Sequence, residues 1–139
     1  MFVRHQGKTK LMSLPVTPST AFSAGALVAF SSGLLIPATS TTPGNQIVGV
    51  IRHTIATTDS DYASSRLVEV EVPVEMNTVW QVAVTSGLVV GDIGLYQDLT
   101  DSLTVNRGAS TYDIVQCVGV LSATSGLFLL NIGPLSNAH

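Results

Sequence analysis

The sequence predicts an all-β protein whose short antiparallel strands form a compact barrel or sandwich. The segment 67–75 alternates valine with glutamate at period two, which is typical of a strand with one buried face. Elsewhere the apolar runs are short and are separated by turn residues, as at 31–33 (Ser-Ser-Gly) and 43–44 (Pro-Gly). Turn residues spaced this closely leave almost no segment long enough for a helix.

Ten segments have the composition and spacing of strands. In chain order they are 10–16, 26–30, 34–38, 47–56, 66–74, 78–84, 93–96, 102–105, 113–121 and 127–132. Several connections between them contain a glycine or asparagine that can adopt the positive φ of a tight turn. Within 66–74 the valines at 68, 70, 72 and 74 are the expected buried face. Trp80 lies in the next segment, where it is either a core residue or an interface anchor.

Two parts of the chain have similar sequences, which favours a two-part barrel or sandwich. In segments 25–30 and 91–96 a glycine precedes an aromatic residue by five positions. Each of these segments is followed by one that contains Val-Gly-Val, at 47–51 and 117–121 respectively. Under this interpretation Gly49 and Gly119 are equivalent positions where strands approach closely. The alternative is that any two hairpins with glycine turns look alike.

Length and composition restrict the class of protein. The chain has 139 residues, enough for one domain with its own core, and its single cysteine, Cys117, lies in an apolar run where we expect it to be buried. Only 11% of residues are charged, and a weakly charged surface rich in hydroxyls suits either packing against other proteins or a β-protein with long turns. A net charge of −3 argues against nucleic-acid binding.

The apolar run 21–36 is not expected to cross a membrane or to act as a secretion signal. It is broken at 31–33, and neither half approaches the ~20 residues of a spanning helix. We expect a chain that is neither secreted nor bound to a membrane.

The sequence contains no catalytic motif, so we expect neither an enzyme nor a cofactor. His53 could act as a base, although an outward polar residue on a strand is the commoner case. Asp59 and Asp61 have the spacing that begins a calcium site. The glycine and the distal glutamate of a calcium loop are absent, so a solvated turn is favoured over a bound ion.

The first 19 residues are expected to form an extended arm, with residues 20–139 as the barrel-like domain. An arm that contacts another surface would mix apolar anchors with cations, and removing residues 1–12 would leave the domain folded. A terminal strand within its own sheet is the alternative. The glutamates of segment 67–75 form a line of like charge that is either solvated or receives the basic arm of a neighbouring chain. The expected contact residues are Phe2, Val3, Arg4, Lys8, Lys10, Leu11, Glu69 and Glu71.

The order of these segments resembles the small head-decoration, or capsid cement, proteins of tailed bacteriophages. In that family a Val-Gly-Val-like strand (here 48–50), a Val-Pro-Val-like segment (72–74) and a Gly-Asp-x-x-x-Tyr stretch (91–96) recur in this order, and the similarity covers residues 20–133. The chain departs from the shorter members in its residues 1–19 and in the 57–65 loop.

The resemblance implies a β-barrel or β-tulip-like domain, commonly trimeric, that binds the outside of an icosahedral capsid and strengthens it without catalysis. We therefore expect the major capsid protein and further copies of the chain as partners. We also expect synthesis in the host cytoplasm and a place on the capsid exterior of the virion.

Three other functions stay open at this stage. A head-tail connector, tail or fibre component would also be β-rich and multimeric. A carbohydrate-binding β-sandwich would stack aromatic rings on sugars, but aromatic residues are only 6% of the chain and are dispersed. An enzyme would need His53 to converge with Asp59 or Asp61 in a pocket.

Overall fold

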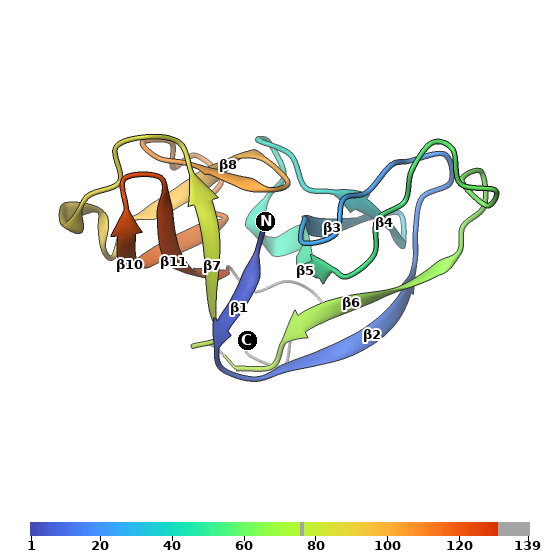
Figure 1. Ribbon diagram of the computed structural model, residues 1–139, viewed down its shortest axis with the longest axis horizontal. Helices are drawn as coiled ribbons and strands as arrows, with labels where there is room; N and C mark the ends of the chain where they lie inside the picture. Colours follow the sequence, from blue (N-terminus) through green and yellow to red (C-terminus); the bar gives the residue numbers. More distant parts are fainter. Residues whose placement is uncertain (76, 131–139) are drawn as a thin grey trace.

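A computed structural model describes residues 1–75 and 77–130 and confirms the all-β fold (Figure 1). Two 3-10 turns, η1 (Gly44–Gln46) and η2 (Val90–Asp92), accompany the strands. The strands are β1 (Val3–Gln6), β2 (Thr9–Pro15), β3 (Leu27–Ser31), β4 (Leu34–Pro37), β5 (Ile47–Ile51), β6 (Leu67–Pro73), β7 (Val79–Val84), β8 (Tyr96–Asp101), β9 (Thr104–Asn106), β10 (Val115–Ser122) and β11 (Ser125–Leu130).

The strands form two five-stranded units with the same order. The first unit runs β2-β6-β5-β3-β4 and the second β7-β11-β10-β8-β9, so that each has the order 1-5-4-2-3 when numbered from its own first strand. Strand β1 is added beside β7. Figure 1 shows the second unit on the left and the first on the right. The expected two-part organisation is therefore present.

Each unit also brings its first strand next to its third. In the second unit β7 pairs with β9 in parallel through Val84 and Val105, which closes the sheet into a barrel. In the first unit the corresponding contact is a single parallel bridge between Val16, just after β2, and Leu35 of β4. The two units therefore share their mode of closure as well as their strand order.

The register of the repeat differs from the predicted one. The N–H of Gly25 donates to the carbonyl oxygen of Ile51 at 2.9 Å, and the N–H of Gly94 donates to that of Cys117 at 2.7 Å. Both glycines have positive φ, 86° and 94°. Gly25 is thus equivalent to Gly94 and not to Gly91.

The two Val-Gly-Val segments are consequently not equivalent. Gly49 does mark a close approach of strands, because a Cβ there would collide with the carbonyl oxygen of Glu71. A Cβ at Gly119 would come within 3.1 Å of the Leu127 side chain and meets no backbone that close. The predicted strand 93–96 is also wrong except at its end: η2 and a turn precede β8, which begins at Tyr96. The prediction for residues 131 and 132 lies outside the described residues.

The core consists of two clusters, and one of them spans both units. Val68, Val70 and Val72 of β6 are buried inside the first unit, as predicted, whereas Val74 follows the strand and is only partly buried. The neighbouring residues of β3 point to opposite faces, since side chains alternate along a strand. Val28 faces the interior of the first unit, whereas Leu27 packs in the cluster that contains Trp80.

Three further buried side chains belong to the cluster that spans both units. The burial of two of them, Trp80 and Cys117, bears on expectations from the sequence. Trp80 is a core residue with no exposed surface, and its indole Nε1 has no hydrogen-bond partner. Cys117 is buried as expected, and burial raises the pKa of its thiol. Phe2 is only 3% exposed and belongs to the same cluster.

The N-terminal segment is extended, as predicted, but it is not a separate arm. Strand β1 pairs with β7 in the second unit, and β2 pairs with β6 in the first along its whole length. The N–H of Phe2 donates to Gly25 O at 2.7 Å, and the Met1 amine donates to Leu103 O at 3.0 Å. Burial lowers the pKa of that amine. The boundary at residue 19 is therefore wrong, because β2 is the first strand of a unit and Phe2 fills the shared core.

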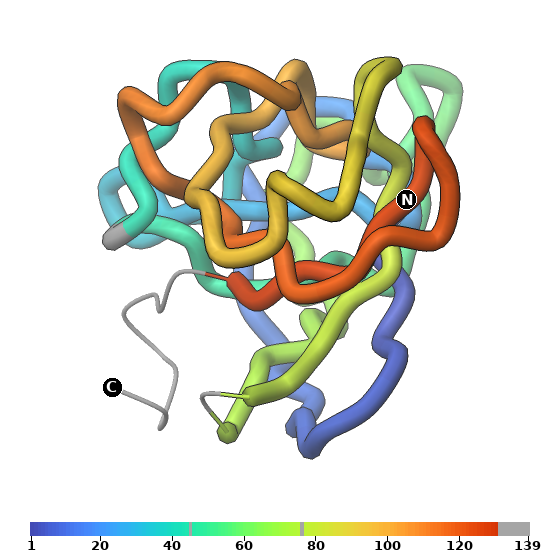
Figure 2. Tube along the Cα trace, turned by 90° about the vertical axis from the view of Figure 1, so that its left-hand side faces the viewer, coloured from blue at the N-terminus to red at the C-terminus, as the bar shows by residue number. Residues whose placement is uncertain are grey.

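The turn between β1 and β2 lies beside the connection from β6 to β7, as both views of the chain show (Figure 2). The N–H of Lys8 donates to Glu75 Oε1 at 2.9 Å, and the Thr78 hydroxyl donates to Lys8 O at 2.9 Å. Removal of residues 1–12 would delete β1, most of β2 and these contacts. Such a truncation is expected to disrupt folding, contrary to the prediction for a free arm.

Replacement of Phe2 by alanine tests this placement. Loss of a buried phenylalanine leaves a cavity, and we expect Phe2→Ala to lower the free energy of unfolding by about 3 kcal/mol. Its neighbour Val3 is 50% exposed, so Val3→Ala is the matched control and should cost less than about 1 kcal/mol. Denaturant unfolding of the two variants measures the difference. Equal, small effects would mean that Phe2 does not pack in the core.

Candidate interaction surface

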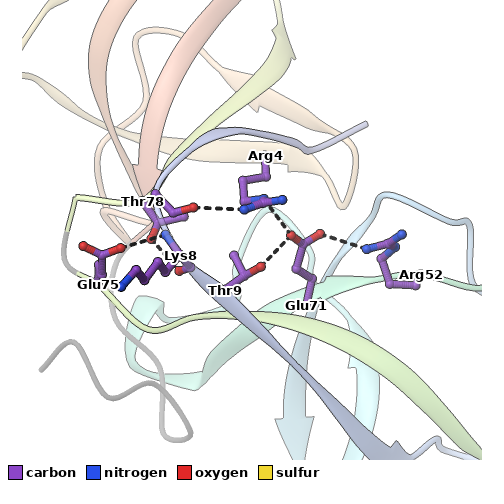
Figure 3. A network of polar contacts seen from close by, with 8 residues as sticks. Arg4, Lys8, Thr9, Arg52, Glu71, Glu75 and Thr78 are labelled. Carbon is purple, nitrogen blue, oxygen red and sulfur yellow. Dashed lines mark hydrogen bonds and ion pairs between the residues drawn. The ribbon is translucent and has the colours of Figure 1, made fainter.

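The two localised charge features of the sequence meet within a single chain. Glu71 of β6 is 8% exposed and lies between two arginines (Figure 3). Its Oε2 is 3.2 Å from Arg4 Nε, and its Oε1 is 3.4 Å from Arg52 Nη1. The Thr9 hydroxyl donates to Oε2 at 2.8 Å. The hypothesis that Glu71 receives a neighbour's basic arm is therefore wrong: it is neutralised by its own chain.

The strand register explains this arrangement. Leu11 of β2 is opposite Glu71 on β6. Just before β2, a turn connects it to β1, which contains Arg4. Arg52 directly follows β5, which pairs with β6 beside Glu71. A buried carboxylate is costly unless it is paired, so the two arginines and the hydroxyl compensate for its burial.

The other predicted contact residues have different environments. Glu69 is half exposed and its Oε1 is 3.6 Å from His53 Nε2. Lys8 is exposed and Lys10 partly buried. Val3 and Leu11 are exposed by 50% and 55%. Phe2 and Glu71 are thus buried within the chain, whereas the other six are at least partly exposed.

The residues considered for metal binding or catalysis do not contact one another, and each has another polar partner. Arg66 Nη1 donates to both oxygens of Asp61, at 2.8 and 3.0 Å, and this guanidinium lowers the pKa of the carboxyl. Asp59 Oδ2 accepts the N–H of Ala56 at 3.1 Å. His53 lies against Glu69 instead of either aspartate. Within residues 1–75 and 77–130 no group of three or more His, Cys, Asp or Glu side chains could hold a metal ion.

A large apolar surface lies on the second unit, and it was not predicted. Two adjacent segments, 88–96 and the end of β10, are joined by hydrogen bonds from Gly94 N to Cys117 O (2.7 Å), Cys117 N to Leu95 O (3.0 Å) and Leu88 N to Ala123 O (3.0 Å). Seven of their large apolar side chains are exposed by 38% to 75%: Val89, Val90, Ile93, Leu95, Tyr96, Val118 and Leu121. We call these seven residues the apolar surface.

A buried aspartate shapes the turn that carries part of this surface. Asp92 Oδ2 accepts the N–H of Val89 at 2.9 Å and the Nε–H of Arg107 at 3.0 Å. The Arg107 hydrogen bond holds the pKa of Asp92 below its usual value. Leu88, at 3% exposure, anchors the start of the turn in the core. The tip therefore presents Val90, the most exposed of the seven, in a defined position.

Charged side chains border the apolar surface on one side, where Arg107 and Asp113 line a hollow together with Leu95 and Tyr96. Between residues 86 and 96, and between 117 and 125, the one charged residue is Asp92, which is buried and paired with Arg107. The sequence signal was the apolar composition of 88–96, in which six of nine residues are large and apolar. The excess over those that the core buries indicates a second apolar contact.

No protein-family model matches the chain, and no curated protein does either. No helix within the described residues has the length and apolar character needed to cross a membrane.

The Glu71 cluster gives a testable contrast between two glutamates on one strand. Glu71→Gln removes the charge facing Arg4 and Arg52, and we expect a loss of about 1–3 kcal/mol in unfolding free energy, at the low end because both arginines are half exposed. Glu69→Gln is the matched control and should stay within about 0.5 kcal/mol. Urea unfolding at low salt measures both. A destabilisation by Glu69→Gln as large as that by Glu71→Gln would contradict the assigned pairing.

Proposed function

We propose that this protein is a non-enzymatic structural protein that binds the outer surface of an icosahedral bacteriophage capsid as an oligomer and stabilises it. The apolar surface is the observation that carries this proposal. A single folded chain rarely leaves a large contiguous apolar patch exposed unless the patch meets a partner. Seven exposed apolar side chains on two adjacent segments suit burial in an assembly, because few polar groups of these segments lose their hydration.

The polar clusters support a structural role over a catalytic one. The hollow beside Glu71 is lined by Arg4 and Arg52, and each of these arginines is already paired with Glu71. Asp92 is likewise paired with Arg107. Side chains engaged in this way hold strands together, and neither carboxylate is free to act as a general base.

The aromatic residues weigh against sugar binding. Among the described residues Tyr96 alone of the aromatic side chains is exposed by more than a third, while Trp80 and three of the four phenylalanines are fully in the core. A sugar site that stacks rings on its ligand needs several such side chains on one face. The choice of the capsid as partner rests on the resemblance of the segment order to that of cement proteins. That resemblance implies the major capsid protein as the binding partner and the virion exterior as the location.

Co-sedimentation with empty shells of the virus that encodes this chain tests the proposal. We expect the protein to pellet with shells up to a saturating copy number and to raise the temperature at which the shells break. An unrelated protein of similar size is the control for trapping in the pellet. Protein that stays in the supernatant at every ratio would contradict the proposal, and binding to isolated tails alone would favour a connector or tail component.

A further inference from the structure

The hollow beside Glu71 lies where the sheets of the two units meet. Its volume is about 410 Å³, within the ~300–1,000 Å³ of typical ligand sites. Val3 and Arg4 of β1 line it from the sheet of the second unit, whereas Ile51 of β5 and the following Arg52 line it from the first. Figure 3 shows that the two arginines approach Glu71 from different sides. The hollow thus brings two cations from different parts of the chain to one carboxylate.

Glu71 has more arginine partners than the other carboxylates that pair with arginine in the described part of the chain. Asp92 is buried to a similar degree, with 6% exposure against 8% for Glu71, yet it pairs with Arg107 alone. Asp61 likewise pairs with Arg66 alone. A single arginine is therefore enough to balance a carboxylate in this fold. The side chains that line the hollow carry two positive charges and one negative charge, which leaves one positive charge in excess.

The neighbouring polar groups do not remove this excess from the hollow. Glu69, the next carboxylate along β6, is not among the lining residues, and its Oε1 is 3.6 Å from His53 Nε2. The Thr9 hydroxyl donates to Glu71 Oε2 and so supplies that carboxylate with a third donor beside the two arginines. Glu71 is thus satisfied without drawing on every N–H of the arginines.

Both guanidinium groups keep donors that a further group can use. A guanidinium carries five N–H donors in a planar fork. Within residues 1–75 and 77–130, Arg4 contacts Glu71 through Nε and the carbonyl oxygen of Gly7 through Nη1, and Arg52 contacts Glu71 through Nη1. Nη2 of both arginines and Nε of Arg52 have no partner among these residues. The two side chains are 49% and 53% exposed, so a group that enters the hollow can contact them.

We propose that the hollow binds a carboxylate group, carried by an aspartate or glutamate side chain of a partner protein. One excess positive charge matches the single negative charge of a carboxylate, whereas a phosphate group carries about −1.5 to −2. The planar fork of arginine fits a carboxylate through two parallel hydrogen bonds.

The rest of the hollow suits the apolar part of such a side chain. Apart from Arg4, Arg52 and Glu71, the residues that line it are all apolar, and Val3 and Ala24 among them are at least partly exposed. The methylene groups of an acidic side chain can pack against these residues while its carboxylate meets the arginines. The inference rests on the proposed function only for naming the capsid protein as the carrier of this side chain.

An acetate titration followed by NMR tests the site without any shells. Acetate is the simplest carboxylate probe, and sodium chloride at equal ionic strength is its control. We expect the Nε–H signals of Arg4 and Arg52 to shift and to saturate, with a dissociation constant of about one millimolar. Signals of Arg66 and Arg107 should move no more than they do in chloride. Shifts in acetate that merely equal those in chloride would overturn the inference, and tighter binding of inorganic phosphate than of acetate would overturn the choice of a carboxylate.

Two arginine variants locate the site. Arg52→Gln removes the excess charge while Arg4 and Thr9 still hold Glu71, and we expect acetate to bind at least about fivefold more weakly. The matched control is Arg66→Gln, which removes an arginine paired with Asp61 and should change the dissociation constant by less than about twofold. Circular dichroism melting confirms that both variants fold. An Arg52→Gln variant that binds acetate as tightly as the wild type would contradict the assignment.

Co-sedimentation of the same variants with shells separates this inference from the proposed function. We expect Arg52→Gln to bind shells at least about fivefold more weakly than the wild type and Arg66→Gln to bind like it. A wild type that saturates with acetate but ignores shells would support the carboxylate site and refute the capsid role. Shell binding that is equal in the wild type and in Arg52→Gln would keep the capsid role and refute a shell carboxylate in the hollow.

Discussion

The alternation of side chains across the first sheet is the constraint on which the rest of the structure depends. Val28 and Val48 fill the first unit, whereas Leu27 and Val50 from the same strands pack against the second. A sheet buried on both faces has strands that are apolar at nearly every position, as β5 (IVGVI) is. Because the two units share these side chains, neither has a complete core alone.

The N-terminal strand is part of this shared core. Phe2 enters the cluster between the units, and Arg4 places its guanidinium on the buried carboxylate of Glu71. β1 belongs to the sheet of the second unit and β2 to that of the first, so the first fifteen residues connect the two sheets covalently and through hydrogen bonds. The basic and apolar residues of the N-terminal segment, which suggest a free arm in the sequence, therefore contact other residues of the same domain. Seven of the exposed large apolar residues lie instead on two segments of the second unit.

Local sequence patterns predicted the structural features that depend on residues close together in the chain. The valines of β6, the hairpin turns and the burial of Cys117 follow from period two, glycine positions and composition. The pairing of Arg4 with Glu71 joins residues that are 67 positions apart, which no local pattern reveals. The repeat was found, but identical Val-Gly-Val tripeptides suggested the wrong register. The hydrogen bonds of Gly25 and Gly94, and their shared positive φ, establish the correct one.

Comparison of the two units relates the exposure of the apolar surface to the lengths of two connections. The lengths of the connections 52–66 and 123–124 are visible in the sequence once the strands are known, yet they have meaning only after β5 is matched to β10 and β6 to β11. Within residues 1–75 and 77–130, one long loop covers its end of the fold, and one short turn leaves the equivalent end open. The difference in exposure thus accompanies a difference in connection length between two units that share one strand order.

A reconstruction of decorated capsids by electron cryomicroscopy would test the central claim most directly. The account predicts oligomers on the outer shell, with Val90 and Leu121 of each copy buried in a contact and with β1 paired to β7 of its own chain. Isolated copies whose apolar surface faces solvent would contradict it, as would a β1 strand inserted into a sheet of the shell.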